Sequence, residues 1–206
     1  MKYLIIIFGV ILIAAIGVFI FRSSGNPDLL TNYPSPNPDV IAYGDSLVEG
    51  VGSTDGNDFV SLLSAKIGQP ITNLGRSGDT TVDGIARIGE LDNYNPKVVL
   101  LLLGGNDHLK QIPITETHNN LAILIQNIQA RGAVVLLLGV RGGLFNDRFG
   151  PEFQNLSQTY HTAFVPDVLA GLFGNVNYMS DAIHPNNAGY QIIADRIYPV
   201  LAPLLK

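Results

Sequence analysis

Short runs of consecutive hydrophobic residues alternate along the chain with segments whose hydrophobic residues recur every three or four positions. A continuous run is typical of a parallel strand covered on both faces, and the wider spacing is typical of a helix with one buried face. The runs are 40–43, 71–74, 97–103, 133–138 and a shorter one at 161–165, and the helical segments are 59–67, about 81–89, 115–131, 153–160 and 188–201, the last capped by Asn186 or Asn187. Strands that alternate with helices predict an α/β fold, a doubly wound three-layer sandwich with about five parallel strands.

The chain begins with a much longer apolar segment. No residue from Leu4 to Phe21 is charged. As a helix rising ~1.5 Å per residue, this segment would be ~27 Å long, close to the thickness of a bilayer core. The residues before Arg22 lack the small side chains of a signal-peptide cleavage site. We therefore expect residues 1–22 to form a transmembrane anchor, with a cleaved signal peptide as the alternative.

Both alternatives predict export of the remaining chain. With an anchor, the domain is held on the membrane in the periplasm or at the cell surface, and after cleavage it is periplasmic or secreted. Residues 23–38 are rich in Ser, Asn and Pro, which predicts a flexible linker. Residues 39–206 are enough for a single domain with a full core, and we expect that domain to be monomeric.

Composition narrows the chemistry that this domain can perform. The chain has no cysteine, so it contains no disulfide, no thiolate nucleophile and no cysteine-bound zinc. The net charge is -5, and no cluster of Lys and Arg indicates a nucleic-acid surface. We expect no nucleic-acid partner, and membrane contact only through the N-terminal helix.

A serine directly follows the first predicted strand, in the sequence Gly44-Asp45-Ser46. Ligands of open α/β sheets bind at the carboxyl ends of the strands. Asp181 and His184 are three residues apart in the loop before the last helix, a spacing that lets the carboxylate contact the imidazole. The carboxylate would fix the imidazole tautomer, and the other ring nitrogen could then take a proton from Ser46.

Two other predicted strands are followed by groups that can donate hydrogen bonds to an oxyanion. Gly78 follows the second strand and offers a backbone N–H, and Asn106 follows the third and offers a side-chain amide. One such donor typically contributes about 3–4 kcal/mol of transition-state stabilisation. If the strands are parallel, these groups and Ser46 converge on one edge of the sheet.

Each of these residues also has a purely structural interpretation. A serine at a strand-to-helix junction is commonly a helix N-cap, and a histidine near a terminal helix is commonly structural. Asp45 and Asp107 are best interpreted as residues that hold their turns by accepting backbone hydrogen bonds. The individual motifs therefore leave both interpretations open.

The four polar motifs, taken together and in order, resemble the blocks of the SGNH (GDSL) hydrolases. The blocks are Gly44-Asp45-Ser46-Leu47 with Gly50, Gly78-Asp79 after Asn73, Gly105-Asn106-Asp107, and Asp181 with His184-Pro185. Leu103 to Asp107 and the loop around Arg141 are most similar to the bacterial group of thioesterase I, lysophospholipase L1 and arylesterase. The resemblance covers about residues 40–205.

This resemblance implies a serine esterase that hydrolyses carboxylic esters or thioesters of acyl chains through an acyl-enzyme. It implies Ser46 as the nucleophile, His184 as the base and Asp181 as the acid that orients the base. It further implies an oxyanion hole formed by the N–H groups of Ser46 and Gly78 and by the Asn106 side chain. A flavodoxin-like sheet, no cofactor and no metal are also implied.

The substrate pocket is the least determined part of the site. Apolar residues in two loops are candidates for an acyl-binding wall, and Arg141 is either at the lip of the site or in a structural ion pair. The candidates are Leu109, Ile112, Leu144 and Phe145. A small ester or an acyl lipid is the expected substrate. The alternatives are a carbohydrate O-acetylesterase and a catalytically inactive, membrane-tethered binding protein.

Overall fold

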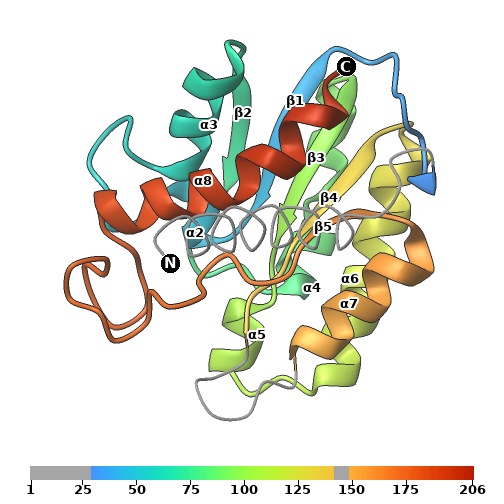
Figure 1. The fold of residues 1–206 in the computed structure, drawn as a ribbon. Coiled ribbons are helices and arrows are strands. Elements are labelled where there is room, and N and C mark those ends of the chain that lie inside the picture. Colours follow the sequence, from blue (N-terminus) through green and yellow to red (C-terminus); the bar gives the residue numbers. More distant parts are fainter. Residues whose placement is uncertain (1–28, 142–148) are drawn as a thin grey trace, which may run out of the picture.

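The computed structural model describes residues 29–141 and 149–206 and contains a five-stranded parallel sheet (Figure 1). The order of strands in the sheet is β2-β1-β3-β4-β5, as in flavodoxin-like folds. Every neighbouring pair is parallel. The bounds are β1 Asp39–Gly44, β2 Ile71–Gly75, β3 Pro96–Leu102, β4 Val134–Leu138 and β5 Ala163–Val165. The predicted α/β class and parallel sheet are confirmed.

Helices cover both faces of this sheet. α3 (Phe59–Ile67) and α8 (Asn187–Leu204) contact each other on one face, and α4 (Thr81–Ala86), α6 (Ile114–Ala130) and α7 (Phe149–Tyr160) lie on the other (Figure 1). Two short helices, α2 (Ser46–Glu49) and α5 (Gly105–Leu109), begin at the carboxyl ends of β1 and β3. The site is built around these two helices.

Helix boundaries differ from the sequence prediction at three places. The helix expected over 81–89 ends at Ala86 and is followed by the 3₁₀ helix η2 (Ile88–Asn93). α7 begins at Phe149, earlier than the expected start at 153. α8 extends to Leu204, beyond the expected end at 201. Its start agrees with the prediction, because the side chain of Asn186, one of the two expected caps, accepts hydrogen bonds from the N–H groups of Ala188 and Gly189.

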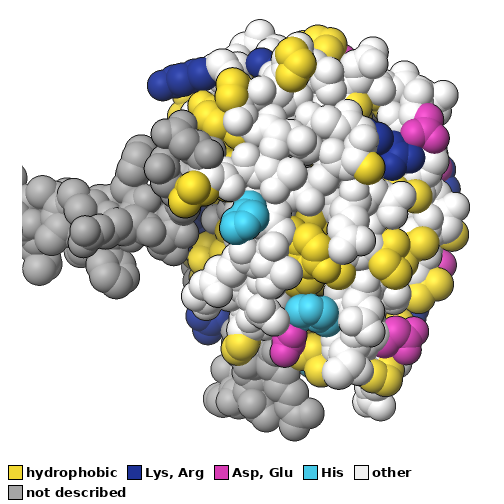
Figure 2. Space-filling model, turned by 90° about the vertical axis from the view of Figure 1, so that its right-hand side faces the viewer, with side chains coloured by type: hydrophobic (Ala, Val, Ile, Leu, Met, Phe, Trp, Pro, Cys, Tyr) yellow, Lys and Arg dark blue, Asp and Glu magenta, His cyan; other side chains and the backbone are white. Residues whose placement is uncertain are grey.

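The core lies between the sheet and its two helical layers. The side chains of β3 and β4 are almost fully buried because both faces of these strands are covered. Tyr43 is also buried, and its hydroxyl donates a 2.6 Å hydrogen bond to the carbonyl of Gly84. On the face drawn in Figure 2, hydrophobic side chains lie in small groups among polar ones, and acidic and basic side chains both occur.

Residues 29–38 pack against the domain, and the structure here differs from the flexible linker expected over 23–38. The side-chain amide of Asn32 donates to the carbonyls of Gln129 (2.8 Å) and Ala133 (3.0 Å). The Ser35 hydroxyl donates to the carbonyl of Gly132 (2.8 Å). Gln129 lies in the last turn of α6, and Gly132 and Ala133 lie between α6 and β4, so these hydrogen bonds fasten residues 29–38 to the connection that follows the helix. Composition alone did not distinguish such a docked segment from a linker.

In the part of the chain that the structure describes, none of the helices combines the length and apolarity needed to span a bilayer. The anchor expected over residues 1–22 lies outside the described residues, as does the first part of the expected linker.

Candidate active site

Ser46 lies at the point where β1 ends and α2 begins. The strand passes so close to its neighbour that a Cβ on Gly44 would be 2.2 Å from the carbonyl oxygen of Leu102, so only glycine fits there. Asp45 then caps α2, and its carboxylate accepts a 3.0 Å hydrogen bond from the N–H of Leu47. The turn places the Ser46 side chain in a pocket at the carboxyl edge of the sheet.

Asp45 is almost completely buried, at 2% exposure. Burial raises the pKa of its carboxyl group to about 7, and the hydrogen bond from Leu47 opposes that shift. Its contact with Leu47 fits the turn-holding role expected from the sequence, and its charge depends on pH in the neutral range.

Asp107 has a comparable position at the start of α5. It is fully buried and accepts hydrogen bonds from the backbone N–H of Thr81 (2.9 Å) and the hydroxyl of Thr117 (3.2 Å).

The loop before α8 brings Asp181 and His184 together. One carboxylate oxygen of Asp181 lies 2.8 Å from His184 Nδ1, and the other accepts the backbone N–H groups of Ile183 (2.8 Å) and His184 (2.7 Å). The N–H of Ser180 donates to the carbonyl of His184 (2.9 Å) and closes the same loop. The hydrogen bond with the His184 side chain, followed by the two backbone N–H groups, lowers the pKa of Asp181 to about 2.

His184 links this loop to the serine. Its Nε2 lies 3.1 Å from Ser46 Oγ, while its Nδ1 faces Asp181. An imidazole with an ionised carboxylate at Nδ1 has its proton there, which leaves Nε2 free to accept a proton from a hydroxyl. Ser46, His184 and Asp181 thus form one continuous chain of contacts. The sequence suggested these three residues, and the structure brings them together.

The two candidate oxyanion donors besides Ser46 lie in neighbouring loops. Asn106 lines the same pocket as Ser46, and its amide donates a 2.9 Å hydrogen bond to the carbonyl of Asp79. Gly78, the residue before Asp79, is not among the pocket-lining residues; it is exposed and has a positive φ of 86°, which favours glycine. Asn106 is therefore bound to the loop that carries Gly78, through the neighbouring residue.

The predicted acyl wall is partly present. Leu109 and Arg141 line the pocket, and Ile112 is not among the lining residues. Leu144 and Phe145 lie outside the described residues. Arg141 also makes an ion pair with Asp167 (3.1 Å). It therefore both lines the pocket and takes part in an ion pair, so both alternatives considered for it apply.

Most of the apolar lining comes from residues that the sequence did not single out. These are Val140, Phe149, Leu169, Phe173 and Ile183, together with the imidazole of His108, whose ring packs edge-on against Phe149 at 5.5 Å. They follow three different strands and were indistinguishable from ordinary core or loop residues. Val140, Leu169 and Ile183 lie within a few residues of a predicted strand end or of His184, but Phe149 and Phe173 had no such signal.

Within residues 29–141 and 149–206, the structure contains no group of three or more His, Cys, Asp or Glu side chains arranged to bind a metal ion.

The chain is similar to several known hydrolases. The sequence pattern of the GDSL-like Lipase/Acylhydrolase family matches residues 42–192. The esterase TesA of Pseudomonas aeruginosa is 32% identical over 178 residues, which cover 81% of this chain and 89% of that protein. Thioesterase 1/protease 1/lysophospholipase L1 of Escherichia coli is 29% identical, covering 86% and 89% of the two chains. A crystal structure of TesA superposes with a TM-score of 0.76 at 31% identity, covering 82% of this chain and all of that one.

Proposed function

Because the chain belongs to the GDSL-like lipase/acylhydrolase family and is an esterase of that family, we propose that Ser46 is its nucleophile, His184 its general base and Asp181 the acid that orients the base. The observation that carries this proposal is the chain of contacts from Asp181 to His184 (2.8 Å) and from His184 to Ser46 (3.1 Å). The second distance is within hydrogen-bond reach, which is the geometric requirement for a base acting on its nucleophile.

The reaction proceeds in two halves. In the first, Ser46 Oγ attacks the carbonyl carbon of an ester or thioester while His184 Nε2 takes the hydroxyl proton, and the protonated imidazole then gives that proton to the leaving alcohol or thiol. In the second, water attacks the acyl-enzyme with His184 again as base, and the acid product leaves Ser46. Asp181 remains ionised throughout, which agrees with its lowered pKa.

The negative charge of each tetrahedral intermediate needs donors that are already in place. The Asn106 amide is held by the carbonyl of Asp79, so its orientation is fixed before a substrate binds. We include the backbone N–H groups of Ser46 and Gly78 as the other two donors. Preorganised donors of this kind stabilise a developing oxyanion without reorganisation at the moment of reaction.

The apolar lining of the pocket supports an acyl chain as the group that is bound. Leu109, Phe149 and Phe173 surround the space next to Ser46, and only a few polar groups lie among them. The names of the two relatives, an esterase and a thioesterase/lysophospholipase, agree with a carboxylic ester or thioester of an acyl chain as the substrate. A carbohydrate O-acetylesterase would need a polar surface for the sugar.

The test is hydrolysis of p-nitrophenyl esters from acetyl to palmitoyl by the full chain and by Ser46→Ala. We expect turnover that favours chains longer than acetyl and that falls by about 10⁶-fold in the variant. Ser53→Ala is the matched control, because that hydroxyl donates to the Gly50 carbonyl and is not among the residues that line the pocket. Acetyl-only turnover would favour the O-acetylesterase, and equal activity in both proteins would eliminate Ser46 as the nucleophile.

We also propose that residues 1–22 anchor the enzyme in a membrane with the domain on the extracytoplasmic side. The uncharged segment from Leu4 to Phe21 supports the anchor. Cell fractionation tests it: the full-length enzyme should sediment with membranes and resist extraction by high salt. A shorter protein in the soluble fraction would instead indicate a cleaved signal peptide.

A further inference from the structure

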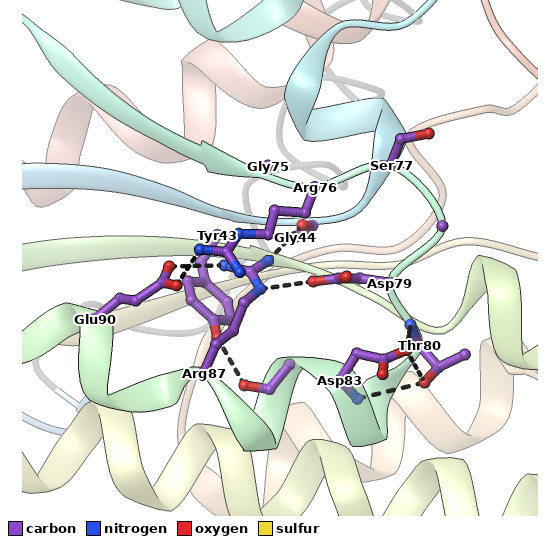
Figure 3. A network of polar contacts seen from close by, with 12 residues as sticks. Tyr43, Gly44, Gly75, Arg76, Ser77, Asp79, Thr80, Asp83, Arg87 and Glu90 are labelled. Carbon is purple, nitrogen blue, oxygen red and sulfur yellow. Dashed lines mark hydrogen bonds and ion pairs between the residues drawn. The ribbon is translucent and has the colours of Figure 1, made fainter.

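A buried arginine lies beneath the loop that carries Gly78 and holds the side chain of Asn106. Arg87 follows α4, and its side chain is only 7% exposed. The guanidinium donates from Nε to the carboxylate of Asp79 (2.6 Å) and from Nη2 to the carbonyl of Gly44 (2.8 Å), and it lies 4.1 Å from the centre of the Tyr43 ring (Figure 3). A third contact, from Nη1 to Glu90, is longer at 3.3 Å.

The partners of Arg87 are the segments that form the site. Gly44 is the last residue of β1 and lies two positions before Ser46. Asp79 directly follows Gly78, and the backbone carbonyl of Asp79 holds the side chain of Asn106. One planar guanidinium therefore connects the end of β1, next to the nucleophile, with the loop that carries Gly78 and holds Asn106.

Other contacts also hold this loop. At its start the backbone N–H of Arg76 donates to the carbonyl of Gly44 (3.0 Å), and at its end Thr80 caps α4. Between these two points, two contacts lie at the surface. The backbone N–H of Ser77 donates to the carboxylate of Glu49, and Lys110 Nζ donates to the carbonyl of Gly78 (3.1 Å). Such exposed contacts are weakened by solvent. The ion pair between Arg87 and Asp79 is shielded from solvent, with side-chain exposures of 7% and 16%. It therefore restricts the position of the loop more than the exposed contacts do.

We propose that Arg87 is a positioning residue for the oxyanion hole. It fixes the Asp79 loop relative to the end of β1, so that Asn106 and the Gly78 N–H face the oxyanion that forms when Ser46 Oγ attacks the carbonyl carbon. Lysine retains the charge but offers a single nitrogen, which cannot contact Asp79 and Gly44 in the directions that the fork of a guanidinium reaches. The inference rests on the proposed role of Asn106 in the reaction.

The test compares four proteins: the full-length wild type, Arg87→Lys, Asn106→Ala and the double variant. A misplacement of about 1 Å can cost about 10²-fold in rate, so we expect Arg87→Lys to lower kcat by between about 10-fold and 10²-fold with KM nearly unchanged. In the Asn106→Ala background, the same change should lower kcat by a clearly smaller factor, because only the Gly78 N–H remains of the two donors that Arg87 positions.

Three features keep the result interpretable. Arg131→Lys is the matched control, because Arg131 pairs with Asp92 (2.9 Å) at the end of α6 and should retain wild-type kcat. Asp79→Asn is a second variant that removes the same ion pair from its other side, and it replaces Arg87→Lys in the cycle if that protein does not fold. Unchanged kcat in the variant, or equal losses in both backgrounds, would overturn the inference. Failure of the proposed function is a separate result, because Ser46→Ala would then remain active.

Discussion

The two halves of the site are held by different means. Asp181, which is exposed, and His184, whose side chain is 14% exposed, form the exposed half. The hydrogen bonds that hold the carboxylate against the imidazole and close the loop lie within residues 180–184. Ser46, Asn106 and the Asp79 loop form a buried half, whose segments come from three different strands and are joined through Arg87 and Asp79. The exposed half therefore depends on local turn geometry, whereas the buried half depends on tertiary structure.

Because of this difference, substitutions in the two halves should affect turnover and stability to different extents. A change in the exposed half removes few buried contacts and should affect turnover while the fold remains intact. A change in the buried half disturbs shielded charges and hydrogen bonds, so it should alter stability or its pH dependence as well.

The largest expected effect is on the exposed half, from Asp181→Asn. The amide NH2 of asparagine can donate to His184 Nδ1, which places the imidazole proton on Nε2, and loss of the correct tautomer typically lowers kcat by about 10⁴-fold. The melting temperature should remain close to that of the wild type, because Asp181 is exposed. Steady-state kinetics and thermal unfolding measure the two quantities. Asp195→Asn, an exposed change on α8, is the control, and a loss smaller than about 10-fold would show that another group orients His184.

In the buried half, Asp45→Asn should change the pH dependence of stability. The pKa of Asp45 is about 7 in the folded protein against an ordinary value of 3.8, so between these values the folded state retains a proton that the unfolded state has lost. The free energy of unfolding therefore falls as pH rises through this window, by on the order of 4 kcal/mol from this group alone. Asparagine has no such titration, and it can still accept the Leu47 hydrogen bond as an N-cap.

Urea denaturation of the wild type and of Asp45→Asn at pH 4 and pH 8 measures this effect. Relative to the wild type, the variant should gain stability between the two pH values. A difference between the two proteins that is the same at both pH values would mean that Asp45 does not titrate in this window.

The smallest expected effect is that of Lys110→Gln, at the surface of the buried half. Its hydrogen bond to the Gly78 carbonyl is exposed, and exposed contacts of this kind contribute about 0–1 kcal/mol. We expect kcat to change by less than about 3-fold. A loss as large as that of Arg87→Lys would show that the loop is held from its exposed side rather than from beneath.

The exposed half, and the positions of Ser46 and Asn106 in the buried half, could be predicted from the sequence because they depend on local patterns. The spacing of Asp181 and His184 within one loop was sufficient to suggest their contact, and the run 97–103 predicted the central strand whose end leads to Asn106. Ser46 followed from its position after an apolar run. These features depend on chain-local patterns and on the rule that parallel strands end at one edge of a sheet.

The contacts of the buried half could not be predicted in the same way. Arg87 has the sequence signature of an ordinary surface residue at a helix end, and only the tertiary structure brings it to Asp79 and Gly44. The pocket wall formed by Phe149 and Phe173 likewise depends on the positions of loops that carry no periodic signal. Residues 29–38 have the composition of a linker, and long-range hydrogen bonds to the end of α6 determine their structure.

The most direct test of the account is covalent labelling with diethyl p-nitrophenyl phosphate, followed by mass spectrometry of the intact chain and its peptides. An activated serine forms a stable phosphoryl ester as p-nitrophenolate leaves, so we predict one diethylphosphoryl group per chain, on Ser46, with activity lost in proportion. Labelling should be absent in Ser46→Ala and much slower in His184→Ala. An enzyme that loses activity through a label on another residue, or remains active with Ser46 fully labelled, would contradict the assignment of Ser46 as the nucleophile.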